Sequence, residues 1–249
     1  GSAADLGSNL VAIDLGGDAE AISCESRHVC ATLGNGDLKC WGYNQDGQLG
    51  LEDTQHRGDG PSEMGANLPA VDLDGSASMV TTRWSHSCAL VGSNVKCWGD
   101  NDNGGLGLGD DAPRGAAAGT MGTALESVDL GSFSPSELAV GFGHTCARDG
   151  GEVKCWGYNG GGALGLGDTQ ARGDGPGEMG NNLDSVDLGS GFEAAALALG
   201  NGFSCALSSA GQVKCWGSNA KGQLGLEDTN DRGNAPGEMG DELPAVDLW

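Results

Sequence analysis

Positively charged residues are scarce in this chain. Lysine and arginine total 12 against 35 aspartates and glutamates, which gives a formal net charge of −23 over 249 residues. Most of the cations recur at fixed places, namely Lys39, Lys96, Lys154, Lys214, Arg57, Arg114, Arg172 and Arg232. The remaining surface is therefore acidic, and an acidic field repels nucleic acid and anionic lipid. We expect no nucleic-acid partner.

The chain also lacks long apolar runs and catalytic motifs. Its longest apolar stretch, Ala194 to Leu199, is far too short to span a bilayer, so membrane insertion is not expected. The sequence contains no phosphate-binding loop, dinucleotide fingerprint or nucleophile elbow, which predicts that the protein is not an enzyme and has no cofactor. No segment shows a sustained helical period or helix caps, so an all-β fold is expected.

Glycine, in contrast, is abundant, and one phrase recurs four times. Glycine accounts for 48 of 249 residues, which favours short strands joined by tight turns. A Cys-Trp-Gly anchor begins at Cys40, Cys97, Cys155 and Cys215, and a period of about 58 residues indicates a repeat architecture. We predict one domain over 10–249, with repeats at 11–69, 70–126, 127–184 and 185–244, an extra terminal strand at 245–249, and a flexible lead at 1–9.

Most of the cysteines form local pairs that bracket a turn. The pairs are Cys30/Cys40, Cys88/Cys97, Cys146/Cys155 and Cys205/Cys215. The closer pairs centre on turns such as Gly150-Gly151, which suit a two-residue hairpin, and the wider pairs centre on Asn35 or Ala210, which suit a three-residue loop. The cysteines stay opposite each other although the loop length changes. We therefore predict four cross-strand disulfides and an oxidising, extracellular compartment; packed, reduced thiols are the alternative.

Cys24 is the one cysteine without a partner in this pattern. Its counterparts in the other repeats are Thr82, Val140 and Leu199, which are small or apolar. We expect Cys24 to be a buried free thiol. An intermolecular disulfide is the alternative, because an odd cysteine in a secreted protein can pair with another chain.

A long polar loop follows each Trp-Gly and carries an aspartate and an arginine four residues apart. The pairs are Asp53/Arg57, Asp110/Arg114, Asp168/Arg172 and Asp228/Arg232. We expect each pair to form an ion pair that pins its loop. The tryptophans of the anchor, and the methionines that follow them at a fixed distance, are expected to pack between repeats.

Two groups of residues have the composition of a metal site. His28, His86 and His144 occupy equivalent places, and three imidazoles that meet near the axis of a closed ring could hold a metal. Phe203 stands in the fourth place, which favours packing instead. Asp100 and Asp102 resemble the start of a calcium loop, although the glutamate that such a loop needs is absent. An ordinary polar turn is the alternative to calcium.

The run His144-Thr145-Cys146-Ala147, followed by 153–159 and 164–168, resembles the RCC1 repeat family. The resemblance covers nearly the whole chain, because the same motifs recur in order four times. It implies a β-propeller of four-stranded blades. Familiar members of the family have seven blades, whereas this chain has four repeats, so we expect a propeller of four blades.

These features predict a non-enzymatic scaffold for protein binding that is secreted or displayed on the cell surface. Chromatin binding needs a basic face, which this acidic chain lacks. The alternative function is that of a structural subunit in an extracellular array or filament.

This alternative depends on a mismatch between strands and hairpins. Five copies of a Val-Asp-Leu strand, at Ile13, Val71, Val128, Val186 and Val246, accompany only four Cys-to-Cys hairpins. The first and last copies would therefore compete for one sheet position or occupy positions in different molecules. An unpaired strand edge can bind a second chain, which favours self-association.

Overall fold

The structure is a computed structural model that describes residues 11–248. The predicted flexible lead at 1–9 lies outside the described residues, as does Trp249. Within residues 11–248, twelve strands form four antiparallel sheets of three strands each, and the helices are four single-turn 3-10 helices. None of the described helices is long and apolar enough to cross a membrane. The predicted all-β class is therefore confirmed.

Each sheet is one blade and contains three consecutive strands of the chain. Blade 1 comprises β1 (Ala19–Glu25), β2 (His28–Leu33) and β3 (Leu38–Gly42), and blade 2 comprises β4 (Ala77–Arg83), β5 (His86–Val91) and β6 (Asn94–Gly99). Blade 3 comprises β7 (Glu137–Val140), β8 (His144–Asp149) and β9 (Glu152–Gly157), and blade 4 comprises β10 (Ala194–Leu199), β11 (Phe203–Ser208) and β12 (Val213–Gly217). The 3-10 helices are η3 (Gly65–Asn67), η4 (Gly122–Ala124), η5 (Gly180–Asn182) and η6 (Gly240–Glu242).

The second and third strands of each blade form a hairpin in which two cysteines face each other. In blade 1 the register places Cys30 directly opposite Cys40, and the other three hairpins repeat this register. A disulfide joins the cysteines in every blade, with Cα atoms 4.1 Å apart. The hairpins absorb the difference in loop length, and the disulfide geometry is the same in all four blades.

The outer edge of each blade is less regular than the family resemblance implies. In blade 1, two separate segments contact the outer edge of the third strand. Arg57 forms an isolated bridge with Gly42, and the Val71 amide donates one hydrogen bond to the Leu38 carbonyl. The same two contacts recur in the other blades. The expectation of four-stranded blades is therefore wrong. Two segments share the place of a fourth strand, and each makes too few backbone hydrogen bonds to form a regular strand.

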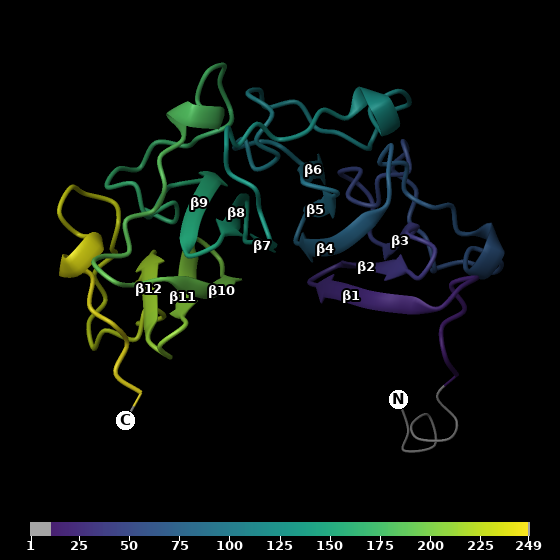
Figure 1. Cartoon of the computed structure of the whole chain (residues 1–249). Coiled ribbons are helices and arrows are strands. Elements are labelled where there is room, and N and C mark those ends of the chain that lie inside the picture. Colours follow the sequence, from purple (N-terminus) through teal and green to yellow (C-terminus); the bar gives the residue numbers. More distant parts are fainter. Residues whose placement is uncertain (1–10, 249) are drawn as a thin grey trace.

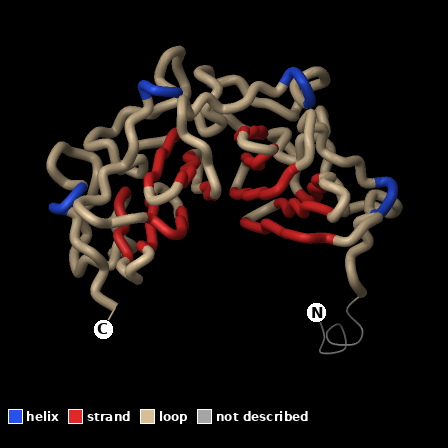
Figure 2. The backbone as a smooth tube through the Cα atoms, in the orientation of Figure 1, coloured by secondary structure: helices blue, strands red, loops and turns tan. Residues whose placement is uncertain are grey.

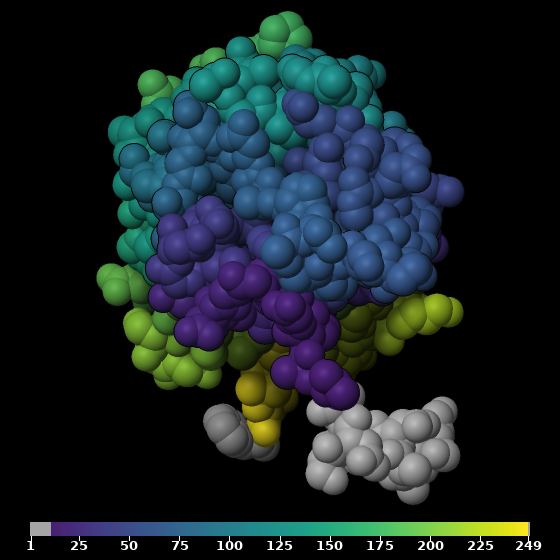
Figure 3. Space-filling view, turned by 90° about the vertical axis from the view of Figure 1, so that its right-hand side faces the viewer, coloured from purple at the N-terminus to yellow at the C-terminus, as the bar shows by residue number. Residues whose placement is uncertain are grey.

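The four blades form an open arc. Figure 1 shows the sheets side by side along a curve, with the first and last blades separated by a gap. The inner strands β1, β4, β7 and β10 lie next to one another in that order. The loops and the 3-10 helices occupy the outer periphery of the arc (Figure 2). The first and last described segments, in purple and yellow, lie on the same side of the molecule, at the bottom of Figures 1 and 3.

The hydrophobic core lies between the blades. One cluster joins Cys88 and Cys97 of blade 2 to Trp156 and Leu138 of blade 3, and equivalent clusters fill the other two junctions. Trp98, Trp156 and Trp216 are completely buried there. Truncation of such a tryptophan to alanine typically costs about 3–5 kcal/mol of stability. Each blade is therefore stabilised mainly by its neighbours, as in other repeat proteins.

The glycine after each tryptophan is required by a close approach of two strands. Gly42 has a φ of 108°, and a Cβ atom there would lie 2.6 Å from the Arg27 carbonyl oxygen. Only glycine accepts both the left-handed backbone and this distance. The Trp-Gly anchor thus packs one blade on the previous one and lets the third strand end against the first turn.

Candidate functional site

The inner turns of the blades bring aromatic side chains to one face of the arc. Arg27 lies in the turn between β1 and β2, Trp84 in the turn between β4 and β5, and Phe142 in the turn between β7 and β8. Tyr43 directly follows β3, and its amide donates a hydrogen bond of 3.0 Å to the Arg27 carbonyl. Tyr158 occupies the same place after β9. All five residues therefore lie at the same end of their sheets.

Four of these side chains form a continuous strip across three blades, which we call the aromatic strip: Tyr43, Arg27, Trp84 and Phe142. The Arg27 guanidinium lies 5.1 Å from the Tyr43 ring centre and 4.8 Å from that of Trp84. The rings of Trp84 and Phe142 meet edge to face at 5.1 Å. An exposed cation–π contact contributes about 0.5–1 kcal/mol, so these contacts order the strip.

The strip is exposed, and its central residue has an unusual backbone. Trp84 leaves 41% of its surface open to solvent, and Arg27 is exposed. Trp84 also has a φ of 50°, in the left-handed region that bulky residues rarely adopt. Such strain tends to persist where a side chain has a function, because a glycine or asparagine would otherwise serve better. The fold thus holds a large aromatic side chain in solvent.

Carboxylates border the strip on the blade 1 and blade 2 side. Burial raises the pKa of Asp46, and the neighbouring charges of Asp100 and Asp102 raise it further, while Arg27 opposes them. The Asp100 carboxylate accepts hydrogen bonds from the Ser85 hydroxyl and from the Asp102 amide. Residues 11–248 contain no group of three His, Cys, Asp or Glu side chains that could hold a metal ion. This face therefore combines aromatic surface with negative charge.

The three histidines are linkers between neighbouring blades. The Nε2 atom of each lies within hydrogen-bond distance of a hydroxyl on the next blade: His28 to Ser87 at 2.7 Å, His86 to Thr145 at 3.0 Å, and His144 to Ser204 at 3.1 Å. They do not converge on one point, so the metal interpretation is wrong and the packing interpretation holds. Burial lowers the pKa of His28 and His144 to about 4. Burial, followed by the two other histidines, lowers that of His86 to about 3.

Each long loop is held by its aspartate and arginine. Arg57 and Asp53 form an ion pair at 2.6 Å, and the equivalent distances are 2.8, 2.7 and 2.7 Å in the other blades. Sequence reasoning missed a third member, a buried asparagine represented by Asn44. Its Nδ2 donates to the Asp53 carbonyl, and its Oδ1 accepts the Leu49 amide. The constant spacing of Asn44, Asn101, Asn159 and Asn219 after each tryptophan was the available signal.

Cys24 is a free thiol, but it is exposed. Its counterparts Thr82, Val140 and Leu199 are buried, because each packs against the blade before it. Blade 1 has no preceding blade among the described residues, so nothing covers Cys24. The expectation that this thiol is buried is therefore wrong.

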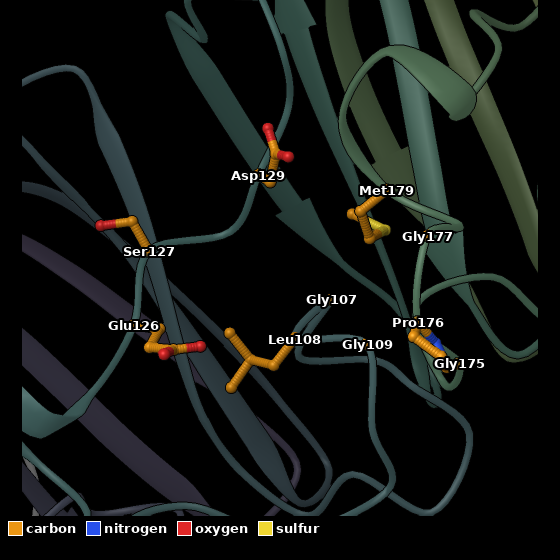
Figure 4. A pocket seen from close by; sticks show the side chains of 10 residues that line it. All are labelled: Gly107, Leu108, Gly109, Glu126, Ser127, Asp129, Gly175, Pro176, Gly177 and Met179. Carbon is orange, nitrogen blue, oxygen red and sulfur yellow. The ribbon is translucent and has the colours of Figure 1, made fainter.

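A hollow lies on the outer rim between blades 2 and 3 (Figure 4). It has a volume of about 270 Å³, with Leu108 and Glu126 on one side and Pro176 and Met179 on the other. A hollow with equivalent lining residues lies between blades 3 and 4. At the junction between blades 1 and 2, Glu52 stands in the place of Gly109 and Gly167 of these hollows. The Glu52 carboxylate accepts hydrogen bonds from three amides of the next loop. These hollows follow from blade packing and hold no catalytic set.

Comparisons with known proteins agree with the fold. The family model described as "Regulator of chromosome condensation (RCC1) repeat" matches residues 20–48 and 194–223. The ultraviolet-B receptor UVR8 of Arabidopsis thaliana is 32% identical over 218 residues, which cover 85% of this chain and 44% of the receptor. The probable E3 ubiquitin-protein ligase HERC6 of Homo sapiens is 28% identical over 219 residues, or 86% of this chain and 20% of that protein.

Solved structures give the same result at lower identity. Human WBSCR16 superposes with a TM-score of 0.66 at 18% identity, covering 94% of this chain and 54% of its own. Prp20p of Saccharomyces cerevisiae superposes with a TM-score of 0.64 at 17% identity, covering 91% of this chain and 50% of its own. This chain thus spans about half the length of such relatives. The family-model matches and the 32% identical relative, together with four successive blades that each carry the Cys-Trp-Gly anchor, place the chain in the RCC1-repeat β-propeller family.

Proposed function

We propose that this protein is an extracellular or cell-surface scaffold that binds a protein partner through the aromatic strip. The observation that carries the proposal is the exposed guanidinium of Arg27 between the rings of Tyr43 and Trp84. Tryptophan, tyrosine and arginine are the residues most enriched among those that dominate binding energy at protein interfaces. Here they lie together at one end of their sheets, on two turns and a strand end.

The partner that fits this surface has an apolar or aromatic side chain and basic groups beside it. Trp84 and Phe142 offer apolar area, and the carboxylates of Asp46, Asp100 and Asp102 lie next to the strip. Charge complementarity of this kind speeds association and excludes acidic partners. The relative Prp20p has binding properties to Gsp1p and histones, which supports a role in protein binding.

We also propose that the protein is secreted, is not an enzyme and requires no cofactor. Four disulfides support an oxidising compartment, because cytosolic proteins rarely keep them. The absence of catalytic motifs in the sequence supports a binding role. The family resemblance adds to this, since propeller blades commonly present loops as binding surfaces.

The proposal is tested with variants of the strip. Trp84→Asn removes the ring, and asparagine tolerates the left-handed backbone of this position. Arg27→Ala removes the central cation. Lys221→Ala is the matched control, because it removes an exposed charge far from the strip in sequence. Immobilised wild-type protein would capture extracellular proteins from its source, and surface plasmon resonance would measure the affinity of each captured protein for every variant.

We expect Trp84→Asn and Arg27→Ala to weaken binding by about thirtyfold or more, since truncation of a dominant interface residue costs at least about 2 kcal/mol. The Lys221→Ala control should bind like the wild type. Equal affinities for all four proteins would refute the aromatic strip as the binding surface.

A structural subunit of an extracellular assembly is the second candidate function. The observation in its favour is that the first and last Val-Asp-Leu segments are each covered on one side only. Ile13 is 60% exposed and Leu248 is 56% exposed, whereas their counterparts Val71 and Leu73 are buried. Open segments at both ends of the arc are what a subunit of an assembly presents.

A further inference from the structure

The three junctions inside the chain share one set of contacts. At the first junction, the Trp98 indole of blade 2 donates a hydrogen bond of 2.9 Å to the Gln48 carbonyl of blade 1. Gly50 lies below this ring, and a Cβ atom there would lie 2.8 Å from the indole nitrogen. Trp156 and Trp216 make the same hydrogen bond, at 3.1 and 3.0 Å, to Gly105 and Ala163. Each blade thus has a front face that carries the tryptophan and a back face that carries the carbonyl.

The front face of blade 1 is one half of such a junction, and we call it the blade 1 end face: Ile13, Ile22, Cys24, Val29 and Trp41. Ile22 is 64% exposed, whereas its counterpart Val80 on blade 2 is 8% exposed. Trp41 is partly exposed, and no carbonyl in residues 11–248 accepts a hydrogen bond from its indole. A hollow of about 300 Å³ lies beside it, lined by Trp41, Tyr43, His56 and Gly58 among others. At interior junctions the equivalent space is filled by the loop of the preceding blade.

The back face of blade 4 is the other half, and we call it the blade 4 end face: Phe203, Leu207, Gly222, Gly225 and Glu227. Gly47 is the counterpart of Gly222 at the junction between blades 1 and 2, and a Cβ atom there would lie 2.3 Å from the next loop. A Cβ atom on Gly222 would have only the Asp228 carbonyl oxygen within 4 Å, at 3.8 Å. Gly225 has only Val246 atoms as its nearest neighbours, whereas Gly50 has Trp98. Leu207 is exposed, whereas its counterpart Leu90 is buried.

The two end faces differ from the interior faces in a matched way. At every interior junction a histidine on the back face meets a serine or threonine hydroxyl on the front face. On the blade 4 end face the histidine place holds Phe203, and on the blade 1 end face the hydroxyl place holds Val29. A phenylalanine opposite a hydroxyl would leave that hydroxyl without its histidine partner, but Phe203 opposite Val29 makes an apolar pair. The two exceptions therefore suit each other.

A second match involves Glu227. It is the counterpart of Glu52, and the two share a left-handed backbone with φ values of 60° and 59°. The carboxylate of Glu52 accepts hydrogen bonds from the amides of Gly119, Thr120 and Met121 in the next blade. Glu227 is exposed and has no such partner in the part of the chain that the structure describes. The equivalent amides on blade 1 belong to residues 62–64.

The terminal Val-Asp-Leu segments are also halves of one contact. Inside the chain a single segment serves both blades: the Val71 amide donates to Leu38 of blade 1, and the Asp72 carbonyl accepts from Gly122 of blade 2. Of these two contacts, the Val246 amide makes the first, to the Val213 carbonyl, and the Asp14 carbonyl accepts the second, from the Gly65 amide. When a back face meets a front face, one of the two terminal segments must leave its place, because only one fits.

We propose that the blade 4 end face of one copy binds the blade 1 end face of a second copy, head to tail, and that one terminal Val-Asp-Leu segment is displaced as they join. The inference rests on the second candidate function and names its interface. The contacts it requires are Trp41 to the Gln223 carbonyl, Phe203 to Val29, and Glu227 to the amides of residues 62–64. Such an interface is heterologous, so it closes into a ring when the rotation permits and otherwise extends into a filament.

Two complementary variants test this proposal in the full chain. Ile22→Lys places a charge on the blade 1 end face, and Leu207→Lys places one on the blade 4 end face. Both positions are exposed in the single chain, so the fold should tolerate them. Sedimentation velocity would be measured from micromolar to millimolar protein, with every protein also carrying Cys24→Ser so that an intermolecular disulfide cannot contribute. Trp84→Asn is the control, because it alters the aromatic strip and leaves both end faces intact.

We expect the wild type and Trp84→Asn to self-associate with rising concentration, and each lysine variant alone to stay monomeric. An equimolar mixture of the two lysine variants should form dimers and nothing larger, because it contains one intact pair of end faces. In the chain with Cys24 present, alkylation of this thiol should slow as the protein associates.

Three outcomes would overturn the proposal. A wild type that is monomeric at every concentration has no such interface. Association that survives in both lysine variants, or that Trp84→Asn alone abolishes, belongs to another surface. A mixture of the lysine variants that stays monomeric excludes the head-to-tail pairing. None of these outcomes bears on binding of a different protein at the aromatic strip, which is measured separately.

Discussion

Acid should weaken this fold through its three buried histidines. Burial lowers the pKa of His28 and His144 to about 4 and contributes most to lowering that of His86 to about 3. In the unfolded chain a histidine has its ordinary pKa of about 6.5. Between these values the unfolded chain binds protons that the folded chain does not, so stability is complete above about pH 6.5 and falls as the pH decreases.

The magnitude follows from linkage. Each histidine reduces the free energy of unfolding by about 1.4 kcal/mol per pH unit inside this window. Three histidines together give a slope of about 4 kcal/mol per unit, which is a large part of the stability of a typical domain. The carboxylates whose pKa is lowered, such as Asp110 and Asp228, act only at more acidic pH, and so do not disturb the window.

The assay is urea unfolding followed by tryptophan fluorescence at several pH values between about 7.5 and 5, where the histidines but not the lowered carboxylates titrate. His86→Phe copies the residue that stands at Phe203, and Thr145 keeps its hydrogen bond to the Gly105 carbonyl in this variant. We expect the slope to fall by about one third, to roughly 3 kcal/mol per unit. Val80→Ala is the control, because it weakens a blade junction without removing a titrating group.

Two results would refute this reasoning. If His86→Phe and the wild type lost stability with the same slope, His86 would not be a buried neutral histidine. If stability rose on acidification, relief of repulsion among the 35 acidic residues would outweigh the histidines. The control should shift the whole curve down and leave its slope unchanged.

Two further predictions concern the last disulfide and calcium. Mild reduction followed by alkylation and mass spectrometry should label Cys205 and Cys215 first, because Cys205 is partly exposed whereas the other three disulfides are completely buried. Equal labelling rates for all four disulfides would contradict the conclusion that this face of blade 4 is uncovered. Millimolar calcium should change the melting temperature no more than sodium chloride of equal ionic strength, because the described residues hold no three-ligand group; a calcium-specific rise that Asp100→Asn removes would instead establish a site.

The local features of the blades could be predicted from sequence. The cysteine pairs lie in hairpins whose register depends on a turn of two or three residues, and the structure joins all four. Asp53 and Arg57 are close enough along the loop to meet, and they do. Such contacts depend on short stretches of chain, so a pattern that repeats four times defines them well.

The arrangement of the blades in an open arc could not be predicted from the sequence. Whether four repeats close a ring depends on the rotation between neighbouring blades, which is set by the packing of Trp98, Gly50 and Leu49 rather than by any motif. The exposure of Cys24 follows from the open arc and was missed for the same reason. The aromatic strip was missed because Trp84 and Phe142 share a place in the repeat with Ser26 and Asn201, so no recurring signal marks it.

The position of the disulfides beneath the following blade has a consequence for maturation. Cys88 and Cys97 lie in a core cluster that Trp156 and Leu138 of blade 3 complete, so an oxidant can reach them only before blade 3 docks. Oxidation and folding must therefore alternate along the chain. Because the amino-terminal blade emerges first during synthesis, each bond can close before its cover arrives. Refolding of the reduced, full-length chain lacks this order and should trap blades that have packed over open thiols.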